Sequence, residues 1–352
     1  MTDWLAPMQQ SFEYYIVDPG TWTDVTRLTT VTSCSITRDI ETDTLGSASI
    51  EMDGEFGEFY LRVYLIANQN GVSDKVPLGT FLVQSPSSSF DGTHTSISMD
   101  AYTPLIELKE NQPPLGYFCR RESNIMATAA DITADHLRAP VVPATSSGVL
   151  YDDFVSNTDD TWMSFLNDLV AMDKFYFNLD EMGRVLFAPK QDTAALQPVW
   201  SYNDDNSSIL YPEIDLDRDL YGIPNVIEVV YSGEYDIYTS RVVNDDPNSP
   251  ISTVSRGREI TQRITNPSFS GEPNQRMVDE YAEQALRDAS TLEYTVKYKH
   301  GYCPVRIGDC VRLNYRRSGI SDVKARVISQ DISCEPGCPV NETAVFTKKL
   351  WR

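Results

Sequence analysis

Short runs of alternating apolar and polar residues fill the first hundred positions, and they limit the fold more than any other feature of the chain. In Ala48-Ser-Ile-Glu-Met52, the apolar side chains fall on one face of an extended backbone, because successive side chains of a strand point to opposite faces. Similar apolar or alternating runs, separated by clusters of Gly, Asp, Asn and Ser, occupy residues 12–17, 34–37, 61–67, 78–84 and 97–102. The pattern predicts an antiparallel β-barrel or sandwich over residues 1–105.

The pattern changes after residue 105. Ser123 or Asn124 is expected to cap a helix that ends near Leu137, and Thr158 or Asp159 a second helix. The apolar stripe of the second helix consists of Trp162, Phe165, Leu166, Leu169 and Met172. Two apolar runs at 175–179 and 184–187 flank a turn and predict a β-hairpin. Residues 106–220 are therefore expected to form a small α+β insert.

Strand patterns return in the last part of the chain. They cover residues 226–231 and 252–263, and later 292–299, 309–315, 323–332 and 342–350. A helix with an apolar stripe is expected at about 274–290. Residues 221–352 thus predict a second barrel with a flanking helix. The expected fold is mainly β, with two antiparallel barrel or sandwich domains flanking an α+β domain.

The net charge of −22 argues against binding of nucleic acid phosphates, which requires clustered Lys and Arg. Acidic and basic residues are equal in number over 224–352, so the whole excess lies in 1–223. One interpretation is solubility, and the other is a surface that repels a polyanion. The sequence lacks an apolar run long enough to span a membrane, and its first residues lack the pattern of a signal peptide.

Motifs that carry catalytic chemistry are not found in the sequence. The three histidines, His94, His136 and His300, are not near a Gly-x-Ser-x-Gly motif, and there is no P-loop, dinucleotide-binding or His-Glu-x-x-His motif. Pairs of carboxylates for glycoside hydrolysis are uninformative in a chain with 51 acidic residues. We therefore expect no catalytic residues and no cofactor, and a cell-wall hydrolase remains the enzymatic alternative.

One segment has the opening of a calcium-binding loop. Asp215-Leu-Asp-Arg-Asp219 spaces three carboxylates as an EF-hand does, but Leu220 and Val226 stand where that loop needs Gly and Glu. A strand would place the three Asp side chains on one face and Ile214, Leu216 and Leu220 on the other. The strand is the favoured interpretation.

Cysteines are too few for a disulfide scaffold. Cys34 and Cys119 stand apart in the sequence and are expected to be ordinary buried thiols. If alternate turns lie at one end of the second barrel, four others become neighbours: Cys303, Cys310, Cys334 and Cys338. Free thiols, one or two disulfides and a zinc site all stay open for these four, although their spacings fit no standard zinc finger.

Two stretches of the chain resemble a known family. The first runs from Val63 to Leu105 and includes Pro77-Leu-Gly-Thr-Phe-Leu-Val83 and Ser98-Met-Asp-Ala-Tyr-Thr-Pro-Leu105. The second runs from Tyr221-Gly-Ile-Pro-Asn225 through Asn244-Asp-Asp-Pro-Asn-Ser-Pro250, Arg256-Gly-Arg258 and the helix around Ala282 and Ala285 to Pro304-Val-Arg-Ile-Gly-Asp309 and Leu350-Trp351. Both resemble baseplate hub proteins of tailed phages, also described as minor tail or tail-tip proteins.

The resemblance implies a structural role at the tail tip of a virion, assembled in the host cytoplasm. The two barrels would resemble the tail-tube protein, so that a homotrimer presents six barrels to a hexameric tube. Its partners would be the tail tube or distal tail ring, the tip or spike protein and the tape measure protein. DNA would pass through at genome ejection without specific binding. The family offers no catalytic residues to transfer, although some of its members carry a lysozyme or peptidase domain further along.

The acidic excess suggests which residues face such a channel. Candidates near strand ends and turns of the first barrel are Asp39, Glu41, Asp43, Glu51, Asp53 and Glu55. The rival interpretation places these carboxylates on an outer surface, where they serve only solubility. Alternatives to the hub are another tail component, such as a distal tail or receptor-binding protein, and the hub of a phage-like injection system.

Overall fold

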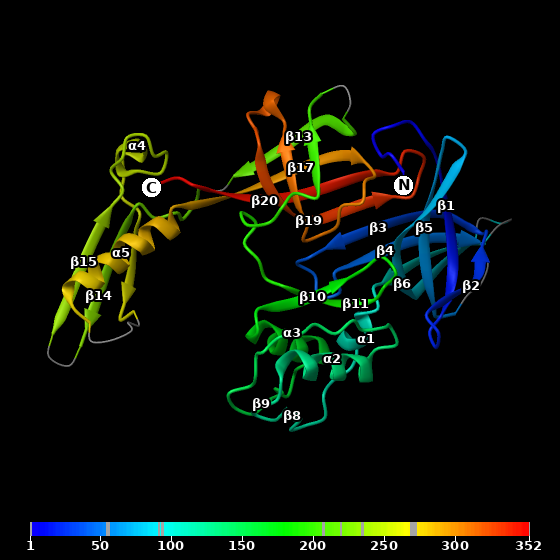
Figure 1. Ribbon diagram of the computed structural model, residues 1–352, viewed down its shortest axis with the longest axis horizontal. Coiled ribbons are helices and arrows are strands. Elements are labelled where there is room, and N and C mark those ends of the chain that lie inside the picture. Colours follow the sequence, from blue (N-terminus) through cyan, green and yellow to red (C-terminus); the bar gives the residue numbers. More distant parts are fainter. Residues whose placement is uncertain are drawn as a thin grey trace. The chain divides into compact units, whose positions relative to one another are not determined.

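The computed structural model describes residues 2–53, 57–90, 92, 95–205, 208–218, 220–233, 236–267 and 273–351. The chain forms two compact units (Figure 1). Unit 1 consists of Met1–Ile214 and Lys297–Ala344, and unit 2 of Asp215–Val296 and Val345–Arg352. Among the described residues, no helix has the length and apolar character needed to cross a membrane.

One hydrogen-bonded network of strands forms most of unit 1. Its order is β13-β17-β20-β19-β3-β4-β7-β6-β5-β1-β2, and β18 joins it by pairing with β19 and β12. Pairing of β3 with β19 connects strands from the two ends of the chain. The bounds are β1 Gln9–Asp18, β2 Thr23–Leu28, β3 Val31–Asp39, β4 Gly46–Asp53, β5 Phe59–Gln69, β6 Val72–Phe90, β7 Thr95–Tyr102, β12 Trp200–Asn203, β13 Leu210–Arg218, β17 Thr291–Gly301, β18 Cys310–Asn314, β19 Val323–Ser333 and β20 Pro339–Lys349.

The main core of unit 1 lies on one face of these strands. Ile36, Ile50 and Leu65 are inaccessible to solvent, and Ile332 and Val340 from the end of the chain pack with them. Alternation explains this arrangement, because β4 has the burial pattern expected of a strand with one face in the core and one in solvent. The mainly β class expected from the sequence is confirmed.

The segment expected as an α+β insert lies in unit 1 as far as Ile214. It contains the short helix α1 (Ile106–Lys109), two longer helices and two small antiparallel sheets. The remaining bounds are β8 Phe118–Cys119, α2 Ile125–His136, β9 Phe154–Val155, α3 Trp162–Met172, β10 Phe175–Leu179 and β11 Val185–Pro189. Trp162, Phe165, Leu166 and Leu169 of the predicted stripe are buried, whereas Met172 at the end of α3 is exposed.

Unit 2 contains a three-stranded sheet in the order β15-β14-β16. The helix α5 (Gln275–Ala289) buries Val278, Ala282 and Leu286 against Ile227 and Val229 of this sheet. The other bounds are β14 Val226–Ser232, β15 Ile237–Val243, α4 Thr253–Arg256 and β16 Thr261–Thr265.

Most of the predicted elements are present, and one of the two candidate caps of α2 was correct. Asn124 caps α2 by accepting a hydrogen bond from the Ala127 backbone N–H, and Asn274 caps α5 in the same way. The predicted cap of α3 was wrong. Thr161, not Thr158 or Asp159, caps it through a reciprocal pair of hydrogen bonds with Ser164. This capping box gives acceptors to two backbone N–H groups that have no partner within the helix.

The strand predicted at 252–263 was also wrong. Ser252 instead caps the short helix α4, and a left-handed Gly257 ends it before β16 begins. Among the described residues, β2, β8, β9, β12 and β15 were not predicted, and β13 was anticipated only at its end. The strand interpretation of Asp215 and Asp217 is confirmed, since both lie in β13. Three residues of the sequence analysis, Glu55, His94 and Asp219, lie outside the described residues.

The two compact units divide the chain differently from the boundaries expected at 105/106 and 220/221. Residues 297–344 pack with the first strands, while 215–296 form the separate unit 2. Sequence patterns can divide a chain only into contiguous segments. Here the chain returns to its first sheet, so unit 1 combines two segments that are distant in the sequence. The division into domains 1–105, 106–220 and 221–352 stays a prediction.

Candidate functional site

The turn between β10 and β11 is held against the first strands by its backbone. The Met182 carbonyl accepts hydrogen bonds from Trp22 Nε1 at 2.7 Å and from Arg62 Nη2 at 3.1 Å. Gly183 follows with φ +74°, and a Cβ built there would lie 2.8 Å from Thr80 Cβ. A side chain at this position would therefore separate the turn from β6.

Arg62 is the buried centre of this contact. Its side chain is 1% exposed and forms an ion pair with Asp24 at 2.8 Å. Nε donates to Thr80 Oγ1 at 2.8 Å, so the guanidinium joins β2, β6 and the insert. A buried cation is tolerated only when it is paired and fully hydrogen-bonded. The arrangement fixes the hairpin of the insert to the sheet.

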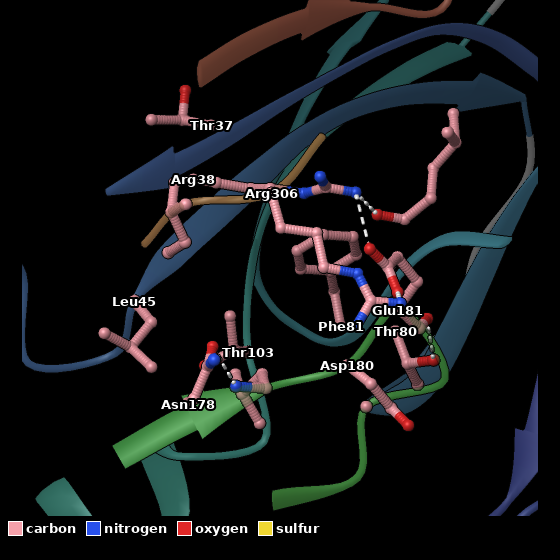
Figure 2. Close-up of a pocket in the computed structure, with 15 residues that line it drawn as sticks. Thr37, Arg38, Leu45, Thr80, Phe81, Thr103, Asn178, Asp180, Glu181 and Arg306 are labelled. Carbon is pink, nitrogen blue, oxygen red and sulfur yellow. Dashed lines mark hydrogen bonds and ion pairs between the residues drawn. The ribbon is translucent and has the colours of Figure 1, made fainter. Parts of the chain in front are cut away.

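Glu181 of the same turn lies between two arginines that come from distant parts of the chain. Arg38 Nη2 lies 3.9 Å from one carboxylate oxygen, and Arg306 pairs with the other. Figure 2 shows both guanidinium groups directed toward Glu181. The adjoining cavity has a volume of about 50 Å³, far below the roughly 300–1,000 Å³ of a ligand site. The cluster is built to join elements, not to hold a substrate.

Gln330 continues the network into the interior of unit 1. Its Oε1 accepts from Arg38 Nη1 at 3.0 Å. The two amide hydrogens are donated to the Val305 carbonyl at 3.0 Å and to Glu342 Oε2 at 2.6 Å. Because every donor of the amide is used, its orientation is fixed. Gln330 thus connects the surface arginines with a fully buried carboxylate.

Glu342 and His300 form the inner end of the network. His300 Nε2 lies 3.4 Å from Glu342 Oε2, and Tyr298 donates to the other oxygen. Burial opposes the charged imidazole, but the hydrogen bonds to Cys303 and Glu342 and the carboxylate charge raise the pKa of His300 to about 10. Burial also opposes the carboxylate, yet the contact with His300 lowers the pKa of Glu342. Both groups are therefore charged at neutral pH.

Cys303, His300 and Glu342 include the residue types of a cysteine nucleophile, a base and an orienting acid. Their geometry does not support that chemistry. His300 Nδ1 donates to the Gly301 carbonyl at 2.7 Å. Cys303 Sγ lies 3.9 Å from the same nitrogen, so the imidazole is not positioned to take the thiol proton. The three side chains are at most 2% exposed. A substrate could not reach them, and the group is a structural network.

An acidic face covers the solvent side of four adjoining strands. Thr37 and Ser35 alternate with the buried Ile36 and Cys34, so their side chains point away from the core. Register places Thr37 beside Asp331, whose carboxylate accepts its hydroxyl at 2.7 Å. The acidic face consists of Ser33, Ser35, Thr37, Asp39, Ser47, Ser49, Glu51, Asp53, Ser98, Asp100, Ser329, Asp331 and Ser333.

These positions hold five carboxylates and eight hydroxyls but no Lys or Arg. Three of the carboxylates, Asp39, Glu51 and Asp53, were candidates from the sequence. Asp100 and Asp331 were missed, although alternation within their strand patterns could have placed them on this face.

Two other candidates, Glu41 and Asp43, lie elsewhere. They belong to the loop between β3 and β4 and line a cleft of about 410 Å³ together with Tyr176, Lys190 and Arg326. Asp43 pairs with Lys109 at 2.9 Å. These contacts show that the loop faces the insert.

The six cysteines are free thiols. The four that were expected to cluster are divided between three places. Cys303 joins the His300 network, Cys310 lies on β18, and Cys334 and Cys338 flank the turn before β20. Cys34 is buried as expected but does not stand apart, since its carbonyl accepts from the Cys334 N–H at 3.0 Å. Among the described residues, no three His, Cys, Asp or Glu side chains are placed to hold a metal ion.

Sequence comparison identifies no relatives: no family model and no curated protein matches the chain. Structural comparison does. The tail protein of Neisseria meningitidis MC58 superposes with a TM-score of 0.62 at 12% identity, covering 97% of this chain and 98% of that one. The 43 kDa tail protein of prophage MuSo2 from Shewanella oneidensis gives a TM-score of 0.62 at 12% identity, covering 95% and 98%.

A chain of the Francisella PdpA–VgrG complex is also similar. Its TM-score is 0.57 at 8% identity, and the match covers 98% of this chain and 53% of that one. The chain therefore has the fold of phage tail proteins and of part of this complex. At these identities, the likeness concerns the fold.

Proposed function

We propose that this chain is a structural protein of a phage tail, the hub that joins the tail tube to the tip or spike. It acts as a homotrimer and forms part of the DNA channel. The fold supports the proposal, because it matches two phage tail proteins over nearly their whole length. Its partners are the tube or distal tail ring, the tip or spike protein and the tape measure protein.

The acidic face is the observation that carries the channel role. DNA that passes through a protein must not be held by it, since each phosphate contact with Lys or Arg adds to binding. A wall of carboxylates and small hydroxyls, with no cation at these positions, repels phosphates within a Debye length of roughly 8 Å. We assign Asp39, Glu51, Asp53, Asp100 and Asp331 to the lumen. Glu41 and Asp43 are not assigned to it, and Glu55 lies outside the described residues.

The polar network explains how the hub keeps its shape under load. Arg62 and Glu181 fix the hairpin of the insert to the sheet, and Gln330 joins this contact to the buried Glu342. Rigid attachment suits an adaptor that must hold neighbouring rings in register. No step of the proposed role requires catalysis or a cofactor.

The decisive experiment is a density map of purified particles. We expect three copies at the tail tip around an axial channel, with the acidic face lining the lumen. A monomer, a hexamer, or an acidic face on the outer surface would refute the corresponding part of the proposal.

A functional test uses charge reversal on the acidic face. The double variant Glu51→Lys/Asp331→Lys should assemble into particles but eject DNA more slowly than wild type. Asp168→Lys, an exposed change on α3 of the insert, is the matched control and should eject at the wild-type rate. Equal rates for all three would leave the acidic face as a solubility feature.

The second candidate is the hub of a phage-like injection system. The likeness to a chain of the PdpA–VgrG complex favours it. Such a hub would occur in particles without a genome, so nucleic acid content of the purified assembly separates the two. A different tail component, such as a distal tail or receptor-binding protein, would differ in copy number or position in the same map.

A further inference from the structure

Two thiols from opposite ends of the chain face each other across β3 and β19. The antiparallel register pairs Ile36 with Ile332 and Ser35 with Ser333. The next position pairs Cys34 with Cys334, whose N–H donates to the Cys34 carbonyl at 3.0 Å. Sequence reasoning grouped Cys334 with other cysteines because it could not foresee this strand pair.

The two side chains lie on the same face of the sheet. Cys34 alternates with the buried Ile36, and Cys334 stands two positions after the buried Ile332. Cys34 packs in the main core of unit 1, and Cys334 is partly buried against the same core. Directly opposite residues of antiparallel strands have Cα atoms about 4.5–5.5 Å apart. That separation falls within the roughly 4.4–6.8 Å range of a disulfide.

The environments of the two thiols differ. Cys334 is partly exposed, whereas Cys34 is 5% exposed. The hydrogen bond with Cys334 and burial raise the pKa of the Cys34 thiol. Cys334 is thus the group that an oxidant meets first, and Cys34 is placed to react second. Cys338 is buried nearby, and burial raises its pKa also.

We propose that Cys34 and Cys334 are an oxidation site at which a low-molecular-weight disulfide, such as oxidised glutathione, creates a cross-strand disulfide. The Cys334 thiolate attacks the oxidant, its S–S bond breaks, and one glutathione leaves as a thiol. The Cys34 thiolate then attacks the mixed disulfide at Cys334 and releases the second glutathione. Two protein thiols are oxidised and one S–S bond of the oxidant is reduced, so electrons balance.

The consequence is a covalent staple between the first strands and the last ones. The bond closes a loop of nearly the whole chain, and long loops lose most unfolded-state entropy on closure. It lies in the sheet that bears the acidic face, but on the opposite side of the strands. Reduction and oxidation would therefore change the thermal stability of unit 1 without changing the acidic face.

The test treats the purified protein with oxidised glutathione, blocks remaining thiols by alkylation and maps the digest by mass spectrometry without reduction. We expect a peptide pair joined through Cys34 and Cys334, and a melting temperature roughly 5 °C higher than that of the reduced protein. Cys338→Ser should retain both results. Cys334→Ser, which changes a partly exposed thiol, should lose both.

Cys310→Ser is the matched control, because it removes a buried thiol on β18 and should behave as wild type. A Cys334–Cys338 bond in the map would show that the turn, and not the strand pair, supplies the second thiol. Persistent glutathione on Cys334, or complete alkylation of Cys34 after oxidation, would equally overturn the proposal.

Discussion

His300 Nε2 and Glu342 Oε2 lie 3.4 Å apart, and neither side chain is accessible to solvent. The pKa of His300 is raised from 6.5 to about 10, so its contribution to stability is complete below pH 6.5 and is lost as pH rises through 10. The pKa of Glu342 is lowered, so its contribution is present above pH 4.5 and is lost as pH falls through the folded-state value.

Urea unfolding should therefore give a lower midpoint at pH 10 than at pH 6.5. In Glu342→Gln, this difference should shrink, because the carboxylate that holds the imidazolium is gone. The variant should also lose about 3 kcal/mol at neutral pH, as expected when one partner of a buried pair is removed. An unchanged pH dependence in Glu342→Gln would show that His300 is neutral in the fold.

Arg62→Met should separate the hairpin of the insert from the sheet. The change removes the cation that pairs with Asp24 and one of the two donors to the Met182 carbonyl, and we expect a loss of about 3 kcal/mol. Hydrogen exchange at residues 180–184 should accelerate. Arg184, which is about half exposed where it pairs with Asp180, provides the comparison, since Arg184→Gln changes a solvent-accessible side chain and should cost at most about 1 kcal/mol. Equal effects of the two changes would contradict the central role of Arg62.

Gly183→Ala tests the close approach of the turn to β6. The residue has φ +74°, and its Cβ would lie 2.8 Å from Thr80 Cβ. We expect a loss of about 3 kcal/mol from strain and overpacking together. Gly116 has nearly the same φ, +75°, but open space around it. Gly116→Ala should cost only about 1 kcal/mol, and equal losses would mean that the contact with Thr80 is unimportant.

The purified protein should not bind duplex DNA at physiological salt, whereas the triple variant Glu51→Lys/Asp100→Lys/Asp331→Lys should. Lysines at these positions would sit on one face of adjoining strands and contact successive phosphates. Binding should weaken steeply as salt increases, with a slope that reflects the number of phosphates contacted. Fluorescence anisotropy over a salt series measures this. Wild-type binding of similar strength would contradict the proposed lumen.

Incubation with bacterial cell walls should release no soluble fragments. The buried Cys303, His300 and Glu342 are joined to structural partners and are closed to substrate. Zymography of the purified protein checks this, with a known lysozyme as the positive control. Clear lysis that disappears after one carboxylate substitution would support the hydrolase alternative and contradict a purely structural role.

Local pattern determined the elements of this protein. Alternation in 48–52 and the apolar spacing of 162–169 depend on neighbours within one strand or helix, so their buried faces followed from the residues alone. The cap Asn124 was found for the same reason. Ser252 misled because a short polar side chain before a strand-like run serves equally well as a cap.

Pairing between distant segments was decided only by the tertiary structure. Nothing local to Thr37 indicates that Asp331 lies beside it, or that Cys34 faces Cys334. Arg38, Glu181 and Gln330 meet because β3, the insert and β19 converge, although each is unremarkable in its own stretch of sequence. The sequence therefore determined the mainly β class, the helices and the acidic excess. The fold determined which carboxylates share a face and which thiols can join, because register and chain return are set by packing of the whole unit.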